Sequence, residues 1–327
     1  MSRVVGGAVV AAVVAVVGLL GMAGTGSAAF PGPNGRITVQ VAGVAPNSSV
    51  NIGIINPNGS GFRLLTNHKP GGAQSFFAAW SPNGKKLAFD VAPARGGSAI
   101  WVMNPDGSGK RLVAGGRHRT AYDVSPFWAS NRLIVFARFR GAGQTSIWAV
   151  RADGVGPAYS LIPAPPKKNL ELPAVSPDGK SILVTETSAT GSALAIAHGD
   201  GSGLHVIPGT AKLDAIAGDF SPDGRWIVTS NNASNGKVSS LIVLHPDGTR
   251  AHRITYPGRH FYNDLLPVWS PDGTQVAFTR TPCPHPKNGC PFGHLAVWVV
   301  NAEGGGAHRI IGPSTTKEYL APDWGRS

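Results

Sequence analysis

The chain has 327 residues and a net charge of +12, although only 14% of its residues are charged. Its 44 Gly and 27 Pro divide the sequence into short segments, which argues against helical bundles and coiled coils and favours many short strands. The basic balance favours acidic partners, such as an anionic polymer or an acidic protein surface.

Residues 1–29 have the pattern of a secretory signal peptide. Arg3 supplies a positive charge, residues 4–22 are almost wholly apolar, and residues 26–29 are small enough for a cleavage site. The apolar run is also long enough to span a bilayer, so a retained membrane anchor is the alternative. We expect cleavage, which leaves residues 30–327 as the exported chain with no stable membrane span. An exported chain is not expected to bind nucleic acid.

Two turn signatures alternate along residues 30–327. The first, Ser-Pro-Asp/Asn-Gly, occurs at residues 81–84, 176–179, 221–224 and 270–273, with degenerate copies at 33–35 and 129–132. The second, an acidic or amide residue followed by Gly, begins at Asn58, Asp106, Asp153, Asp200, Asp247 and Glu303. Both favour tight hairpins because these residues tolerate positive φ. The second signature recurs about every 47 residues, a length typical of one four-stranded propeller blade.

Short β-branched and aromatic runs lie between the turns, for example residues 87–89, 100–103 and 226–228. The final run, which ends at Trp324, has no strand after it, and the run that begins at Asn34 has none before it. Pairing these two ends would complete one blade and leave no open strand edge. The sequence therefore predicts an all-β, six-bladed β-propeller over residues 30–327, with four antiparallel strands per blade and a ring closed by its N- and C-terminal strands.

The repeats resemble a known family. The segments Trp-Ser-Pro-Asp-Gly at residues 269–273 and Ile-Trp-Val-Met-Asn-Pro-Asp-Gly-Ser-Gly at residues 100–109 are similar to the WD40-like propeller repeat of TolB-type proteins. The resemblance covers residues 30–327, and we expect no counterpart of the extra N-terminal domain of TolB. It implies the propeller fold and a place in the periplasm or cell envelope, whereas the partner of a propeller does not follow from its fold.

Cys283 and Cys290 are the two cysteines of the sequence and lie in a Pro-rich insertion. Two cysteines in an exported protein predict a disulfide. A zinc site that adds His285 and His294 is the alternative, although the spacing matches no known zinc finger. We expect the disulfide, with no metal and no cofactor.

Strand alternation should separate the connections into two faces. The turn face carries the near-identical tight turns, and the loop face carries the variable loops, where binding usually resides. On the loop face we expect a funnel mouth formed by Gln74, Tyr122, Asp123, Asn169, Asp214, Asn263, Asp264 and Glu318. A basic rim should surround it, formed by Arg117, Arg119, Arg138, Arg140, Lys167, Lys168 and Arg259. Alternatively, the Asp and Asn side chains of the mouth only hydrogen-bond the turns that enter the strands.

The sequence contains neither a G-x-S-x-G nor an H-E-x-x-H motif, and its histidines are scattered between blades, so no catalytic residue is assigned. The leading hypothesis is a secreted or periplasmic binding scaffold without catalytic activity, acting as a monomer. Its loop face would bind an envelope protein or an anionic polymer. The alternative is a propeller enzyme, a glycan lyase or hydrolase that acts in the central funnel.

Overall fold

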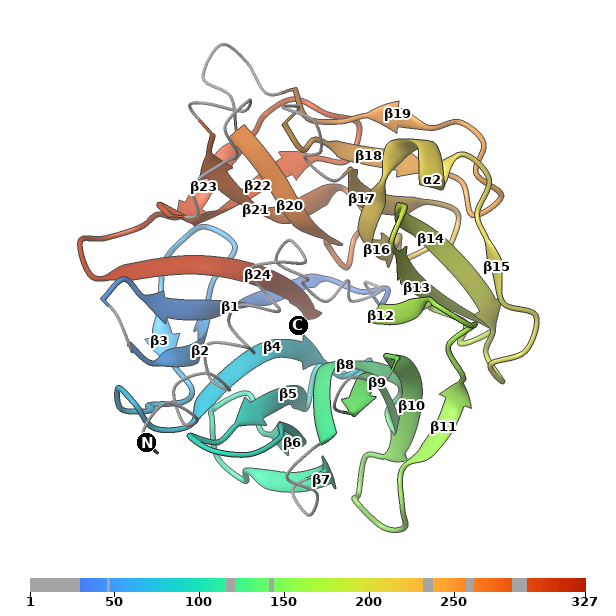
Figure 1. The fold of residues 1–327 in the computed structure, drawn as a ribbon. Helices are drawn as coiled ribbons and strands as arrows, with labels where there is room; N and C mark the ends of the chain where they lie inside the picture. The colour runs from blue at the N-terminus through green and yellow to red at the C-terminus, as the bar shows by residue number, and fades with distance from the viewer. Residues whose placement is uncertain are drawn as a thin grey trace, which may run out of the picture.

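Six four-stranded antiparallel sheets form a ring in the computed structural model (Figure 1). The structure describes residues 30–45, 48–115, 121–140, 144–231, 238–256, 262–283 and 293–327. Each sheet is one blade, and the blades follow one another around the ring in chain order. The predicted six-bladed β-propeller is therefore confirmed.

The strands of a blade are counted here from the innermost to the outermost. Blade 1 contains β24 (Lys317–Arg326), β1 (Asn34–Gly43), β2 (Val50–Ile55) and β3 (Arg63–Leu64). Blade 2 contains β4 (Gln74–Trp80), β5 (Leu87–Ala92), β6 (Ala99–Met103) and β7 (Arg111–Gly115). Blade 3 contains β8 (Ala121–Ser130), β9 (Leu133–Arg140), β10 (Ser146–Arg151) and β11 (Tyr159–Ile162).

Blade 4 contains β12 (Asn169–Val175), β13 (Ser181–Ser188), β14 (Gly191–His198) and β15 (His205–Val206). Blade 5 contains β16 (Ala215–Phe220), β17 (Ile227–Asn231), β18 (Leu241–Leu244) and β19 (His252–Arg253). Blade 6 contains β20 (Tyr262–Trp269), β21 (Gln275–Pro282), β22 (Ala296–Asn301) and β23 (His308–Ile311). A short helix, α2 (Thr210–Leu213), precedes β16. No helix within the described ranges has the length and apolarity needed to cross a bilayer.

The Ser-Pro-Asp-Gly turns are held by side-chain hydrogen bonds. In the copy that joins β12 to β13, Ser176 Oγ donates to Asp178 Oδ1 at 2.6 Å, and Lys180 N donates to the same oxygen at 3.0 Å. Gly179 has a φ of 72°, a conformation that glycine adopts without the steric cost of a Cβ. Such a turn fixes the register of its hairpin locally, because register follows turn geometry.

The two ends of the chain close the ring. Strand β24 pairs with β1 in antiparallel register, with Trp324 opposite Ile37, and Trp324 is 3% exposed. At the first residue of β1, Asn34 exchanges two hydrogen bonds with Asp272 of blade 6, at 2.8 and 3.1 Å. The closure predicted from the unpaired terminal strands is confirmed, and the start of blade 1 is also fastened to blade 6.

The core lies between neighbouring blades. One apolar cluster joins Phe127 of blade 3, Leu183 of blade 4 and Phe220 of blade 5, each at most 1% exposed. Burying one such side chain contributes roughly 1.5–3 kcal/mol. The blades therefore stabilise one another, and together they form the rigid support for the loops.

Candidate binding face around the propeller axis

The loops that follow β7, β9, β17, β19 and β21 all lie on the loop face, because strands alternate in direction within each blade. Residues 116–120, 141–143, 232–237, 257–261 and 284–292 in these loops lie outside the described residues. This range includes the rim residues Arg117, Arg119 and Arg259, and also Cys290. Cys283 is buried, and its disulfide with Cys290 stays a prediction.

Apolar side chains of the innermost strands gather near the axis of the ring. Each innermost strand has an irregular register at one residue with positive φ, and these residues are Phe77, Ser125, Leu172, Ala217, Leu266 and Ala321. All of them except Ser125 belong to one buried apolar cluster, which thereby unites five of the six innermost strands. We infer that the funnel expected on the loop face ends at this apolar cluster.

The strained backbone of these bulges is supported by the preceding blade. Ala217 N donates to Thr185 Oγ1 at 3.0 Å, and Ala321 N donates to Thr279 Oγ1 at 2.9 Å. A left-handed conformation costs a residue with a Cβ roughly 1–2 kcal/mol. Its occurrence in all six innermost strands indicates that closing the ring imposes it, and that packing and hydrogen bonds offset the cost.

The eight residues expected at the funnel mouth do gather on one ring. They lie at, or directly before, the first residues of the innermost strands, on the loop face. In four of them a side-chain oxygen accepts a hydrogen bond from a backbone N–H of the preceding blade. These bonds are Thr145 to Asn169 at 3.0 Å, Ser192 to Asp214 at 2.7 Å, Ser239 to Asn263 at 2.9 Å and His294 to Glu318 at 2.5 Å. Each bond joins the start of an innermost strand to the start of the third strand of its neighbour.

Two further mouth residues are buried in ion pairs. Asp123 accepts from Arg138 Nε at 2.5 Å and from Nη2 at 2.6 Å, and the carboxylate is 0% exposed. Asp264 accepts from Arg280 Nε at 2.6 Å and from Nη2 at 2.8 Å in the same arrangement in blade 6. The Arg138 guanidinium also lies 4.3 Å from the Trp148 ring centroid. Both carboxylates are thus neutralised within their own blade and unavailable to a ligand.

The remaining mouth residues are Gln74 and Tyr122. The Tyr122 ring stacks on Phe139, with centroids 4.7 Å apart and an interplanar angle of 6°. Gln74 is 8% exposed, and among the described residues its Oε1 has no hydrogen-bond partner. Most of the mouth side chains therefore form contacts within or between blades. This is closer to the alternative, in which these side chains have a structural role, than to a free ligand-binding ring.

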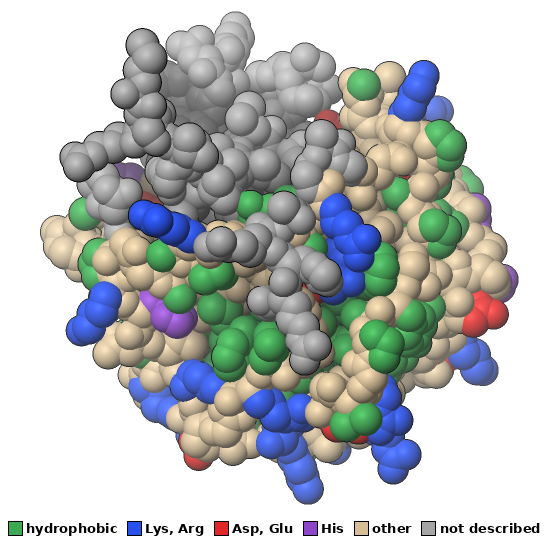
Figure 2. Space-filling view, turned by 60° about the horizontal axis from the view of Figure 1, so that its bottom comes forward, with side chains coloured by type: hydrophobic (Ala, Val, Ile, Leu, Met, Phe, Trp, Pro, Cys, Tyr) green, Lys and Arg blue, Asp and Glu red, His purple; other side chains and the backbone are tan. Residues whose placement is uncertain are grey.

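The basic rim divides into paired and exposed cations. Arg138 pairs with Asp123, and Lys168 Nζ lies 2.6 Å from Glu186 Oε1. Arg140 and Lys167 are exposed, and among the described residues neither forms an ion pair. In the view of Figure 2, Lys and Arg side chains are spread over the visible surface, whereas acidic side chains appear only at isolated places.

Several buried acids escaped the sequence analysis. Burial raises the pKa of Glu171 to about 7, and this residue occupies a position where the other innermost strands have apolar residues. Burial likewise raises the pKa of Asp90 and of Asp219 well above the usual range, and the nearby Asp323 raises that of Asp219 further. For Glu171 and Asp219, alignment of the six innermost strands gave a signal, because an acid stands there at a position that is mostly apolar in the other blades; Asp90 lies on the second strand of its blade, outside that alignment.

No group of three or more His, Cys, Asp or Glu side chains placed to hold a metal occurs in the described ranges. Of the alternative zinc set, Cys283 and His294 are described, whereas His285 and Cys290 lie outside those ranges.

No family model matches the chain. A segment of 86 residues is 34% identical to the Tol-Pal system protein TolB of Gluconobacter oxydans, and it spans 26% of this chain and 18% of that relative. The crystal structure of TolB from Acinetobacter baumannii superimposes with a TM-score of 0.70 and 15% identity, over 90% of this chain and 67% of the other. A putative TolB from Agrobacterium tumefaciens gives 0.64 and 17%, over 89% and 99%.

Propeller enzymes also share the architecture. An oligogalacturonate lyase in complex with manganese superimposes with a TM-score of 0.53 and 11% identity, over 87% of this chain and 75% of the other. At these identities the likeness concerns the fold. The chain has a TolB-type propeller fold, as the repeats predicted, and resembles TolB in sequence over one segment.

Proposed function

We propose that this protein is an exported binding scaffold whose loop face engages an acidic surface of a cell-envelope partner. The TolB-type propeller and the similarity to a protein of the Tol-Pal system support a place in the envelope and a protein partner. The scaffold acts as a monomer, since pairing of β24 with β1 already completes the ring within one chain.

The observation that carries the proposal is the charge balance of the loop face. Asp123 and Asp264 are neutralised by their own arginines and buried, so they do not oppose an acidic partner. Arg140 and Lys167 stay exposed around them. Exposed cations on a rigid face steer an acidic partner toward it and speed association.

A binding role also agrees with the chemistry of the funnel. Within the described residues a buried apolar cluster joins five of the innermost strands, and four of the mouth side chains form hydrogen bonds between blades. The alternative is a glycan lyase or hydrolase that acts in the funnel. The shared architecture favours it, but the described residues contain no group of side chains placed to hold a metal.

Export is part of the proposal and has its own test. Removal of residues 1–29 would give a mature chain that begins at Phe30, or at Ala29 if cleavage occurs one residue earlier. Intact-mass measurement of protein recovered from outside the cytoplasm checks this. A mass that includes residues 1–22 would show a retained anchor instead.

The binding face is tested by charge reversal on the two faces. We expect Arg140→Glu with Lys167→Glu to weaken binding of polyglutamate, used as a mimic of an acidic protein surface. Lys85→Glu with Lys110→Glu on the turn face is the matched control, because it changes the net charge equally and both residues are exposed. The difference should shrink in high salt, because the Debye length falls from about 10 Å at 0.1 M to about 3 Å at 1 M. Equal losses in the two variants would reduce the attraction to overall charge, and a loss only in the control would place binding on the turn face.

A further inference from the structure

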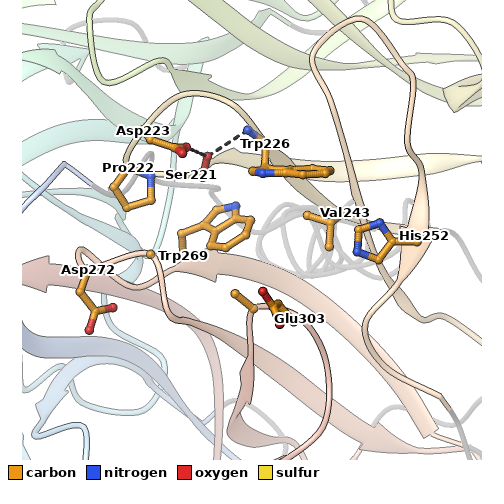
Figure 3. A pocket seen from close by; sticks show the side chains of 11 residues that line it. Ser221, Pro222, Asp223, Trp226, Val243, His252, Trp269, Asp272 and Glu303 are labelled. Carbon is orange, nitrogen blue, oxygen red and sulfur yellow. Dashed lines mark hydrogen bonds between the residues drawn. The ribbon is translucent and has the colours of Figure 1, made fainter.

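A groove of about 600 Å³ lies between blades 5 and 6 on the turn face, opposite the face assigned above. Two indole rings, Trp226 and Trp269, form its middle, and the carboxylates of Asp223, Asp272 and Glu303 surround them (Figure 3). Trp226 is half-buried, and the rings of His245 and His252 lie 4.2 and 5.8 Å from its ring, whereas Trp269 is 4% exposed. The groove therefore offers the free part of the Trp226 ring, with acids at its edges.

Comparison of the repeats shows that this groove departs from its equivalents. Strand pairing aligns Trp226 with Arg36, Lys86, Leu133, Ser181 and Gln275 of the other blades. The equivalent groove between blades 4 and 5, of about 440 Å³, contains Ser181 and Phe220 where this one contains Trp226 and Trp269. Trp226 is thus specific to this groove, whereas the position of Trp269 also holds Trp in three other blades.

The charge of the groove is also opposite to that of the chain. The chain has 29 Lys and Arg against 17 Asp and Glu, yet none of the 11 lining residues is Lys or Arg. Among the described residues, Asp223 Oδ2 and the exposed Glu303 carboxylate accept no hydrogen bond, whereas Asp272 is engaged by its own turn and by Asn34. Two carboxylate groups are therefore available to a ligand.

The carboxylate of Asp223 is charged at neutral pH. Partial burial would raise its pKa, but hydrogen bonds from Ser221 Oγ and Arg225 N outweigh burial, so the pKa lies below the usual value. The same balance, with hydrogen bonds from Ser270, Thr274 and Asn34, lowers the pKa of Asp272. Negative charge beside a partly exposed indole ring is the environment that attracts an organic cation.

We propose that this groove is a second binding site, which takes an arginine side chain presented by a partner protein. The planar guanidinium stacks on Trp226, and its N–H groups donate to Asp223 Oδ2 and Glu303. Arginine fits better than lysine because it is planar and donates in a fork that matches carboxylates. The loop face and this groove would thus select surfaces of opposite charge.

The test uses the mature chain and the peptide acetyl-Gly-Arg-Gly-amide, with the citrulline peptide as its neutral isostere. We expect saturable binding of the arginine peptide, followed by tryptophan fluorescence and by the indole N–H signal of Trp226 in NMR spectra. The citrulline peptide should bind about tenfold more weakly, since it keeps the shape but loses the charge that drives cation–π and carboxylate contacts.

Glu303→Gln and Trp226→Ser should each weaken binding of the arginine peptide by about fivefold or more. Trp226→Ser introduces the residue that blade 4 has at this position, Ser181. Glu303 is exposed, so Glu303→Gln still tests the proposal if Trp226→Ser disturbs packing. Asp247→Asn, at the equivalent turn position of blade 5, is the matched control and should leave binding unchanged. Equal binding of both peptides, equal losses in Glu303→Gln and Asp247→Asn, or binding of chitotriose without the arginine peptide would each overturn the proposal.

Discussion

Replacement of Arg280 by Met should destabilise the propeller strongly, because it leaves a buried carboxylate unpaired. Asp264 is 0% exposed and receives two hydrogen bonds from Arg280, at 2.6 and 2.8 Å. The guanidinium also lies 4.8 to 5.2 Å from the ring centroids of Tyr262, Phe278 and Trp298. Removing one partner of a buried pair costs about 3–5 kcal/mol, a large part of the roughly 5–15 kcal/mol by which a domain is stable.

The assay is the free energy of unfolding from urea titration at neutral pH. Lys168→Met is the comparison variant, because the Lys168–Glu186 pair is more exposed, at 39% and 10%, than the Arg280–Asp264 pair, at 12% and 0%. Pairs exposed to solvent contribute about 0–1 kcal/mol, so this variant should lose little.

A double variant separates the loss of the ion pair from the cost of leaving a buried charge unpaired. Arg280→Met combined with Asp264→Leu removes both charges, and it should recover most of the stability lost by Arg280→Met alone, to within about 1–2 kcal/mol of the parent. If Arg280→Met is no less stable than Lys168→Met, or if the double variant is less stable than the single one, the assigned role of the buried carboxylate is wrong.

Truncation after Leu320 removes most of β24, including the buried Trp324, and leaves most of β1 without its inner partner. The variant should therefore melt well below the full chain when unfolding is followed by circular dichroism. An unchanged melting temperature would contradict closure of the ring by the termini. The Cys283–Cys290 bond, which closes a local loop and restricts the unfolded chain by roughly 2–3 kcal/mol, should appear in non-reducing peptide mapping, whereas two free thiols or bound zinc would exclude it. Burial raises the pKa of Glu171 from its usual 4.5 to about 7, so the folded state holds the proton more tightly and the free energy of unfolding should fall as pH rises between these values. Glu171→Gln should therefore be more stable than the parent at pH 8 but not at pH 4, and the reverse order in urea titrations would show that this carboxyl is not buried.

Local chemistry in the sequence was enough to determine the propeller. Each turn signature holds its hairpin with its own side chains, as Ser176 and Asp178 do, so strand boundaries and register follow from neighbours in the chain. Repetition then determined the number of blades. The unpaired runs that start at Asn34 and end at Trp324 predicted the closure, because an innermost strand without a partner would leave an open edge.

The placement of the mouth residues also followed from the repeats, but their role did not. Asp123 and Asp264 lie near the starts of innermost strands, and their pairing with Arg138 and Arg280 depends on which side of the sheet each side chain takes. The rim prediction counted Arg138 as an available cation for the same reason. A charged residue in the sequence contributes to the surface charge only if its side chain is not paired with a buried residue of opposite charge.

Side-chain contacts between blades could not be predicted from the sequence. The acceptor role of Asn169 toward Thr145, the left-handed bulges of the inner strands and the groove beside Trp226 each combine residues of two blades or depend on closing the ring. The sequence by itself determined the blade, its turns and the number of copies, since these depend on neighbouring residues and on repetition. Only the tertiary structure decided which charges are exposed and which side chains share a groove, because those depend on how one blade packs against the next.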